Sequence, residues 1–268
     1  EDRKEILKIH MRGKPFSPDV NVDNVAKKTV GFSGADIENM LNESAILAAR
    51  NERTAIFPAD VEEAALKVTM GSERRTLQND QEKKVVAYHE AGHALVSSNV
   101  EDMDPVHRVS IIARGGSLGH TSFPPERDRY NETKTRLMSM VATMLGGRAA
   151  EEIIFNEMTV GAASDIQKAT SLVRKMITEY GMSSLGPVSL DGRGDNPWLV
   201  REMGQGNSYS EETASLIDVE VKRTLNDALD KAKNILTQKK ETLDRIAQRL
   251  LEKETIDSDE YLSLLDPK

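Results

Sequence analysis

The strongest constraint on the fold of this chain is the segment His89-Glu90-Ala91-Gly92-His93, which lies in an apolar stretch. The apolar neighbours predict a helix over about 80–98 that is buried on several sides. Residues four apart share one face of a helix, so His89 and His93 can bind one Zn²⁺ ion together. Glu90 can then act as a general base beside the ion. The segment therefore predicts a buried metal-binding helix with zinc peptidase chemistry.

Composition limits the ligands and the partners of such a site. The chain has no cysteine, so any metal must be bound by His, Asp or Glu. The net charge is −8, which argues against a nucleic-acid partner. Aromatic residues make up only 4% of the chain, which favours helices with aliphatic cores. No apolar run approaches the length of a membrane span, so we expect the chain itself to be soluble.

The hydrophobic periodicity predicts a mainly helical fold in two parts. A small helical unit fills the first 70 residues or so, and its third helix begins at a capping box, Ser33 to Asp36. β-branched residues at 106–112 and 118–123 predict a β-hairpin. A Gly-rich segment at 191–208 predicts a long loop. The main helices beyond the metal-binding one are expected at 133–155, at 165–180 and from about 210.

The residues alone do not decide the third metal ligand. A catalytic zinc site needs three protein ligands and one open position. The other histidines, His10, His107 and His120, lie in the first unit or beside the hairpin, so a distant carboxylate is favoured. One candidate is the pair Glu151 and Glu152. The other is Asp165, which can also be explained as a first-turn acid that stabilises its helix.

Several motifs together resemble one family, the FtsH-type AAA proteases, which are membrane-anchored, ATP-dependent zinc proteases. The metal helix, the segment 145–152 (LGGRAAEE), the segment 161–165 (GAASD) and the segment 209–214 (YSEETA) are similar to family signatures in the same order. The resemblance covers nearly the whole chain. It implies that Asp165 is the third zinc ligand, so that each chain binds one Zn²⁺. Glu151 and Glu152 would then support the site or the fold.

The resemblance extends to the first unit, because residues 31–36 (GFSGAD) are similar to the lid subdomain of the AAA ATPase. It implies a lid over residues 1–72, a linker over 73–79 and a metallopeptidase domain over 80–268. In such lids, the positions of Ile6, His10, Gly34 and Ala35 approach the adenine of the nucleotide. Ordinary helix packing and capping explain the same four residues equally well.

The resemblance also implies a larger machine than this chain. The full-length protein would be a homohexamer that uses ATP and Mg²⁺ to degrade unfolded and membrane proteins. It would be bound to the bacterial inner membrane with this region on the cytoplasmic side, or to an organellar membrane on the matrix or stromal side. No G-x-x-x-x-G-K-[ST] loop occurs here, so we expect a part of that protein without its ATPase core.

Two other functions fit the sequence. The chain could be a free-standing zinc peptidase that does not depend on ATP. It could also be a non-enzymatic helical scaffold in which the motif is idle.

Overall fold

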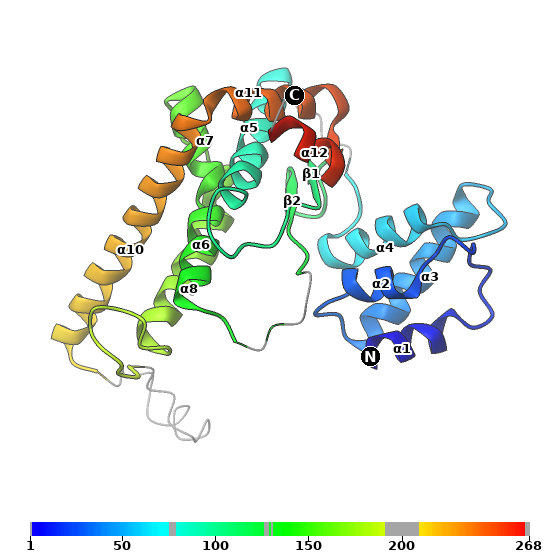
Figure 1. The fold of residues 1–268 in the computed structure, drawn as a ribbon, viewed down its shortest axis with the longest axis horizontal. Coiled ribbons are helices and arrows are strands. Elements are labelled where there is room, and N and C mark those ends of the chain that lie inside the picture. Colours follow the sequence, from blue (N-terminus) through cyan, green and yellow to red (C-terminus); the bar gives the residue numbers. More distant parts are fainter. Residues whose placement is uncertain (1, 75–78, 126–128, 130, 191–208, 266–268) are drawn as a thin grey trace. The chain divides into compact units, whose positions relative to one another are not determined.

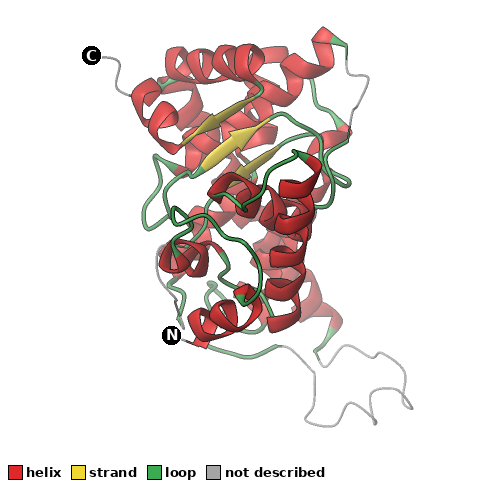
Figure 2. Cartoon of the chain, turned by 90° about the vertical axis from the view of Figure 1, so that its right-hand side faces the viewer, coloured by secondary structure: helices red, strands yellow, loops and turns green. Residues whose placement is uncertain are grey.

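The computed structural model of the chain describes residues 2–265 except 75–78, 126–128, 130 and 191–208. Helices make up most of these residues, and three short strands form one sheet (Figure 2), as the mainly helical prediction requires. The described residues fall into two compact units. The first unit consists of the described residues within Glu1–Ala87, Asp104–Tyr130 and Arg249–Ser263. The second unit consists of those within Tyr88–Met103, Asn131–Gln248 and Leu264–Lys268.

The first unit contains four helices near the N-terminus, with a buried aliphatic core between them. They are α1 (Asp2–Met11), α2 (Val22–Lys28), α3 (Gly34–Arg50) and α4 (Pro58–Met70). The predicted capping box at the start of α3 is confirmed: the amide of Asp36 donates to the Ser33 hydroxyl, and the Ser33 amide donates to the Asp36 carboxylate. Fully buried core residues include Leu7, Ile37, Met40 and Leu41.

The first unit also contains the sheet, which is antiparallel with the order β2-β1-β3. Its strands are β1 (Arg108–Ser110), β2 (His120–Ser122) and β3 (Thr255–Asp257). The β1–β2 pair confirms the predicted hairpin, but β3 was not predicted. Val109 and Ile256 lie opposite each other in the register and are both fully buried, so β3 completes one apolar face of the sheet.

The second unit is a helical bundle in which the long helix α10 packs along three others (Figure 1). Helix α5 is the helix predicted to bind the metal, and it begins in the first unit and ends in the second. Helix α11 begins in the second unit and ends in the first. The elements are α5 (Asp80–Ser97), α6 (Lys134–Met144), α7 (Gly146–Phe155), the 3₁₀ turn η1 (Val160–Ala162), α8 (Ala163–Thr178), α10 (Glu211–Gln238), α11 (Lys240–Lys253) and α12 (Ser258–Leu265).

The single helix expected over 133–155 is wrong in one respect, because the chain breaks at Leu145 into α6 and α7. The break brings the first residues of α7 against α5. A Cβ atom added to Gly92 would lie 2.5 Å from the Gly146 carbonyl oxygen, and one added to Gly146 would lie 2.8 Å from the Gly92 carbonyl oxygen. The two backbones approach so closely that neither position has room for a side chain.

The loop predicted at 191–208 lies outside the described residues. Among the helices that the structure describes, none combines the length and the apolar character required to cross a membrane.

The close approach of α5 and α7 can be tested with Gly92→Ala. The added methyl group would overlap the backbone oxygen of Gly146, and overpacking of this kind costs about 1–3 kcal/mol. We expect a lower free energy of unfolding, measured by urea unfolding followed by circular dichroism. Gly34→Ala is the control, since a Cβ at that helical position has no atom within 4 Å apart from its chain neighbours and the backbone of its own helix. Equal stability of the two variants would contradict the close approach.

Candidate metal site

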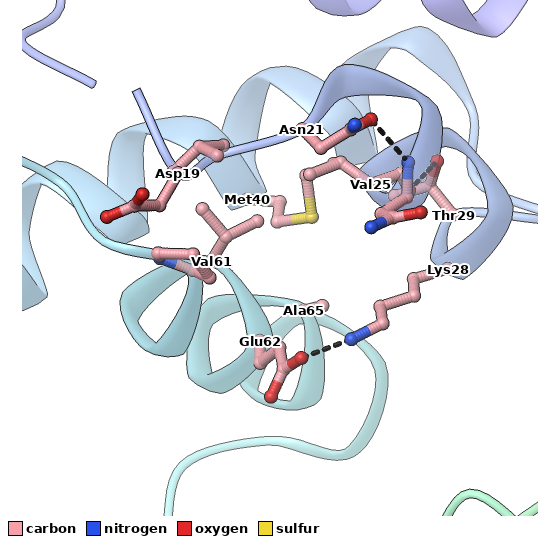
Figure 3. A pocket seen from close by; sticks show the side chains of 12 residues that line it. Asp19, Asn21, Val25, Lys28, Thr29, Met40, Val61, Glu62 and Ala65 are labelled. Atoms are coloured by element: carbon pink, nitrogen blue, oxygen red, sulfur yellow. Dashed lines mark hydrogen bonds and ion pairs between the residues drawn. The ribbon is translucent and has the colours of Figure 1, made fainter. Parts of the chain in front are cut away.

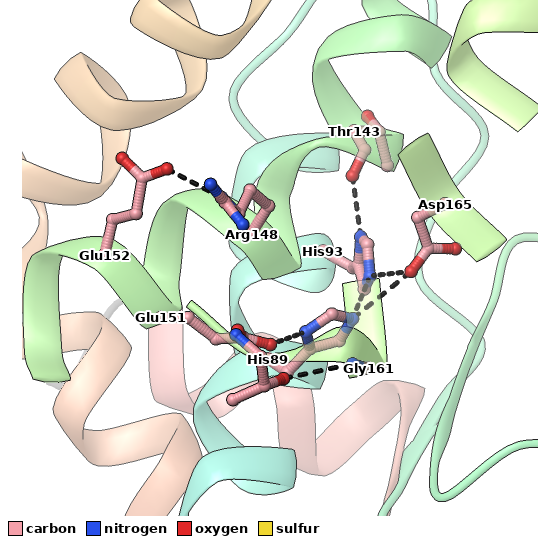
Figure 4. Close-up of polar contacts among 9 residues, drawn as sticks. His89, His93, Thr143, Arg148, Glu151, Glu152, Gly161 and Asp165 are labelled. Atoms are coloured by element: carbon pink, nitrogen blue, oxygen red, sulfur yellow. Dashed lines mark hydrogen bonds and ion pairs between the residues drawn. The ribbon is translucent and has the colours of Figure 1, made fainter. Parts of the chain in front are cut away.

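Two histidine rings on one turn of α5 face each other in the second unit (Figure 4). His89 and His93 are both buried, with 9% and 8% of their surfaces exposed. Their Nε2 atoms lie 3.0 Å apart, and the rings meet edge to face. This is the arrangement predicted from the four-residue spacing.

The hydrogen bonds of the opposite ring nitrogens determine what the Nε2 atoms can do. His93 Nδ1 donates to the carbonyl oxygen of Thr143 at 2.7 Å, because that oxygen can only accept. His89 Nδ1 donates to Glu151 Oε1 at 2.7 Å. In the neutral rings both Nε2 atoms therefore carry lone pairs that point at one another. The space between them needs a positive charge, either a proton or a metal ion.

Asp165 completes this group from the first turn of α8. Its Oδ2 atom lies 3.3 Å from His89 Nε2 and 3.5 Å from His93 Nε2. Zinc bonds to His and Asp are about 2.0–2.2 Å, so tetrahedral ligand atoms lie about 3.3–3.6 Å apart. Both distances from Asp165 lie in this range, and the Nε2–Nε2 distance of 3.0 Å is a little shorter. The three ligand atoms all lie within 4.8 Å of one another, so one metal ion could bind all of them.

The electrostatics of the group also favour a cation. Burial lowers the pKa of His89, but hydrogen bonds to Asp165 and Glu151 outweigh it and raise the pKa to about 10. Burial acts to raise the pKa of Asp165, yet the two histidines hold it below its usual value. Carboxylates thus stabilise positive charge between the rings, and a divalent ion can supply that charge in place of a proton.

The two glutamates that competed for the third ligand position have different surroundings. Glu151 is 1% exposed and accepts from His89 Nδ1 and, through Oε2, from the Thr159 amide at 2.8 Å. Burial acts to raise the pKa of Glu151, but these hydrogen bonds lower it. Glu152 pairs instead with Arg148 at 2.6 Å and with Lys233 of α10. Neither belongs to the group of three, so Glu151 orients a ring and Glu152 joins α7 to α10.

Gly147 gives the segment 145–152 a further constraint that the sequence did not reveal. A Cβ atom at this position would lie 2.4 Å from Nε2 of His89. The imidazole can therefore occupy its place only because residue 147 has no side chain. The sequence also did not predict the roles of the Thr143 carbonyl and of Thr159. The only feature of the sequence that could have indicated close packing here is the pair of glycines at 146 and 147.

Glu90, the predicted general base, follows His89 directly in α5 and is buried, with 7% exposed. Its charge is one of those that raise the pKa of His89, so the carboxylate lies close to the ring. The residue predicted as the base therefore comes from the same helix as the two histidines.

The four residues expected near a nucleotide lie in the first unit, on α1 and at the start of α3. A pocket of about 140 Å³ lies in the same helical part (Figure 3), between α2, α3 and α4. Its lining includes Asp19, Lys28, Met40 and Glu62, but none of Ile6, His10, Gly34 and Ala35. Their contact with a nucleotide stays a prediction.

A bundle with two histidines and a glutamate on one helix and a third donor from another defines a helical metallopeptidase. Comparison with known proteins agrees. The chain belongs to peptidase family M41, which it matches over residues 76–264. Residues 19–63 also match the AAA+ lid domain family. The predicted resemblance and the predicted enzyme class are thereby confirmed.

Individual relatives are similar over nearly the whole chain. ATP-dependent zinc metalloprotease FtsH 3 of Petrotoga mobilis is 48% identical over 268 residues, which is 99% of this chain and 42% of the relative. ATP-dependent zinc metalloprotease FtsH of Thermotoga maritima is 46% identical over 266 residues, 98% of this chain and 44% of the relative. The chain thus spans less than half the length of these relatives.

The different surroundings of Glu151 and Glu152 lead to a paired prediction. Glu151→Gln removes the carboxylate that orients His89, and such supporting partners typically change metal affinity about 10–100-fold. We expect weaker Zn²⁺ binding, measured by competition with a chromophoric chelator. Glu152→Gln should leave the affinity unchanged, because Glu152 contacts only Arg148 and Lys233 among the pairs described above. The opposite pattern would make Glu152 the group that supports the metal site.

Proposed function

We propose that this chain is a zinc-dependent endopeptidase in which His89, His93 and Asp165 bind one Zn²⁺ and Glu90 is the general base. The observation that carries the proposal is the position of Asp165 Oδ2, at 3.3 and 3.5 Å from two Nε2 atoms that are themselves 3.0 Å apart. A buried cluster of this kind is costly without a cation. The zinc named in the relatives supports the choice of metal.

The chain's own residues have separate tasks in peptide hydrolysis. A bound zinc ion would supply Lewis acidity, which polarises a carbonyl and makes water a nucleophile at neutral pH. His89 and His93 bind through Nε2 and keep their orientation through the partners of Nδ1. Glu90 takes the proton of the attacking water and delivers it to the leaving nitrogen. A non-enzymatic scaffold would have no need of this arrangement.

The relatives and the resemblance support a proposal for the substrates and partners. We propose unfolded polypeptides as substrates, including membrane proteins, in a full-length homohexamer driven by ATP and Mg²⁺. The relatives are named ATP-dependent, and the match to the AAA+ lid domain fits such an assembly. A membrane anchor in the full-length protein, with this region on the cytoplasmic, matrix or stromal side, belongs to the same proposal.

The role of Glu90 is tested by Glu90→Gln. The amide cannot accept a proton, and general-base catalysis contributes about 10²–10⁴-fold. We expect casein hydrolysis to fall by at least about 100-fold, while zinc content measured by plasma emission stays at one ion per chain. Glu212→Gln, in the exposed first turn of α10, is the matched control and should keep full activity. Casein hydrolysis at the wild-type rate in Glu90→Gln would remove Glu90 from the mechanism.

The metal ligand on α8 is tested by Asp165→Asn. Loss of a directly bound carboxylate should weaken Zn²⁺ binding more than about 100-fold, beyond the effect of a supporting partner. Asp218→Asn is the matched control, because Asp218 pairs with Arg174 of α8 on the surface. Zinc affinity is measured by chelator competition for both variants. An Asp165→Asn variant that binds zinc as tightly as the wild type would refute the proposed ligand set.

A further inference from the structure

The proposed ligands come from two helices that are far apart in the sequence, so their mutual distance must be set by something other than α5. His89 and His93 are fixed by α5 itself. Asp165 lies in the first turn of α8, which begins directly after the turn η1. α8 packs against α6 and α10, and η1 sets where its first turn begins, so the position of η1 contributes to where the carboxylate of Asp165 lies.

Residues 156–161 offer little packing that could hold this turn, since all six are exposed. Asn156 ends α7 in a left-handed conformation with φ of 50°, and the chain leaves the helix there. Val160 is 92% exposed. Ala162, the last residue of η1, is fully buried, so hydrogen bonds rather than burial must hold the chain between the end of α7 and Ala162.

Those hydrogen bonds converge on Thr159. Its amide donates to Glu151 Oε2 at 2.8 Å. Its hydroxyl accepts from the Gly161 amide at 3.1 Å and so caps η1. The other oxygen of Glu151 accepts from His89 Nδ1, as Figure 4 shows around His89, Glu151 and Gly161. A continuous chain of hydrogen bonds thus joins the ring of His89 to the start of the helix that carries Asp165.

We infer that Thr159 is a positioning residue of the metal site, which joins the two helices that carry the ligands. Its amide ties the turn to Glu151 and its hydroxyl closes the turn, so that Asp165 Oδ2 meets both rings. The inference rests on the proposed zinc site. It assigns to Thr159 a role that its exposed position on a loop would not suggest.

The test uses Thr159→Val, which keeps the amide and the branched shape but removes the hydroxyl. We expect Zn²⁺ affinity, measured by chelator competition, to fall about tenfold, at the lower end of the range for groups that orient ligands. The visible absorption of the Co²⁺-loaded chain should also change, because its bands depend on ligand geometry. Thr159→Ser keeps the hydroxyl and should restore both the affinity and the spectrum.

Thr133→Val is the matched control for simple loss of a cap. Thr133 is exposed and caps α6 by accepting from the Arg136 amide at 3.1 Å, in the same unit but at the opposite end of α6 from Thr143. It should lower thermal stability but leave the zinc affinity and the Co²⁺ spectrum unchanged. If Thr159→Val behaves in the same way, the inference is wrong, and Thr159 serves only the stability of the fold.

The same measurements separate this inference from the proposed function. If the wild type binds no zinc, or if Asp165→Asn binds it normally, the proposed ligand set itself fails. If the wild type binds zinc through Asp165 and Thr159→Val binds it equally well, only the role of Thr159 is refuted.

Discussion

The site in the second unit depends on one electrostatic requirement: two buried imidazole nitrogens 3.0 Å apart need a positive charge between them. α5 is apolar around the motif, with Ala91, Ala94 and Leu95 fully buried, so the two lone pairs lie in a largely apolar surrounding where an uncompensated polar group is costly. The remaining groups of the site stabilise a positive charge at this position or orient the two rings. Carboxylates approach from α7 and α8, and the Thr143 carbonyl fixes the second ring.

Small residues allow the carboxylate of Glu151 to reach the ring. Gly92 and Gly146 bring the backbones of α5 and α7 into contact, and Ala149 and Ala150 are fully buried in the same helix. Gly147 leaves the volume that the imidazole of His89 occupies. Larger side chains at these places would move α7 outward and take Glu151 beyond hydrogen-bond distance of Nδ1. The break at Leu145 also brings Glu151 close to the ring, since it allows α7 to begin directly against α5.

The sequence predicted what depends on neighbouring residues and missed what depends on distant ones. The motif helix, the capping box at Ser33 and the β1–β2 hairpin all follow from local patterns. β3 pairs with β1 across more than 140 residues, and no local pattern marks so short a strand. The choice between Asp165 and Glu151 also depends on how α7 and α8 approach α5. Periodicity places both acids on helices. Only the packing of those helices shows that Asp165 lies near both Nε2 atoms, whereas Glu151 is hydrogen-bonded to Nδ1 of His89.

Three carboxylates, those of Glu151, Glu90 and Asp165, lie around the two histidines, and each has different surroundings. Glu151 accepts from His89 and from Thr159, one partner for each oxygen, so its position and its ionised state are both fixed. Glu90 lies on α5 with the two histidines and is buried, and its charge acts on His89. Asp165 is the one placed through a turn, and its side chain is 23% exposed, more than either ring. The geometry of the site is therefore most easily altered at Asp165, and the hydrogen bonds of the turn before α8 limit that freedom.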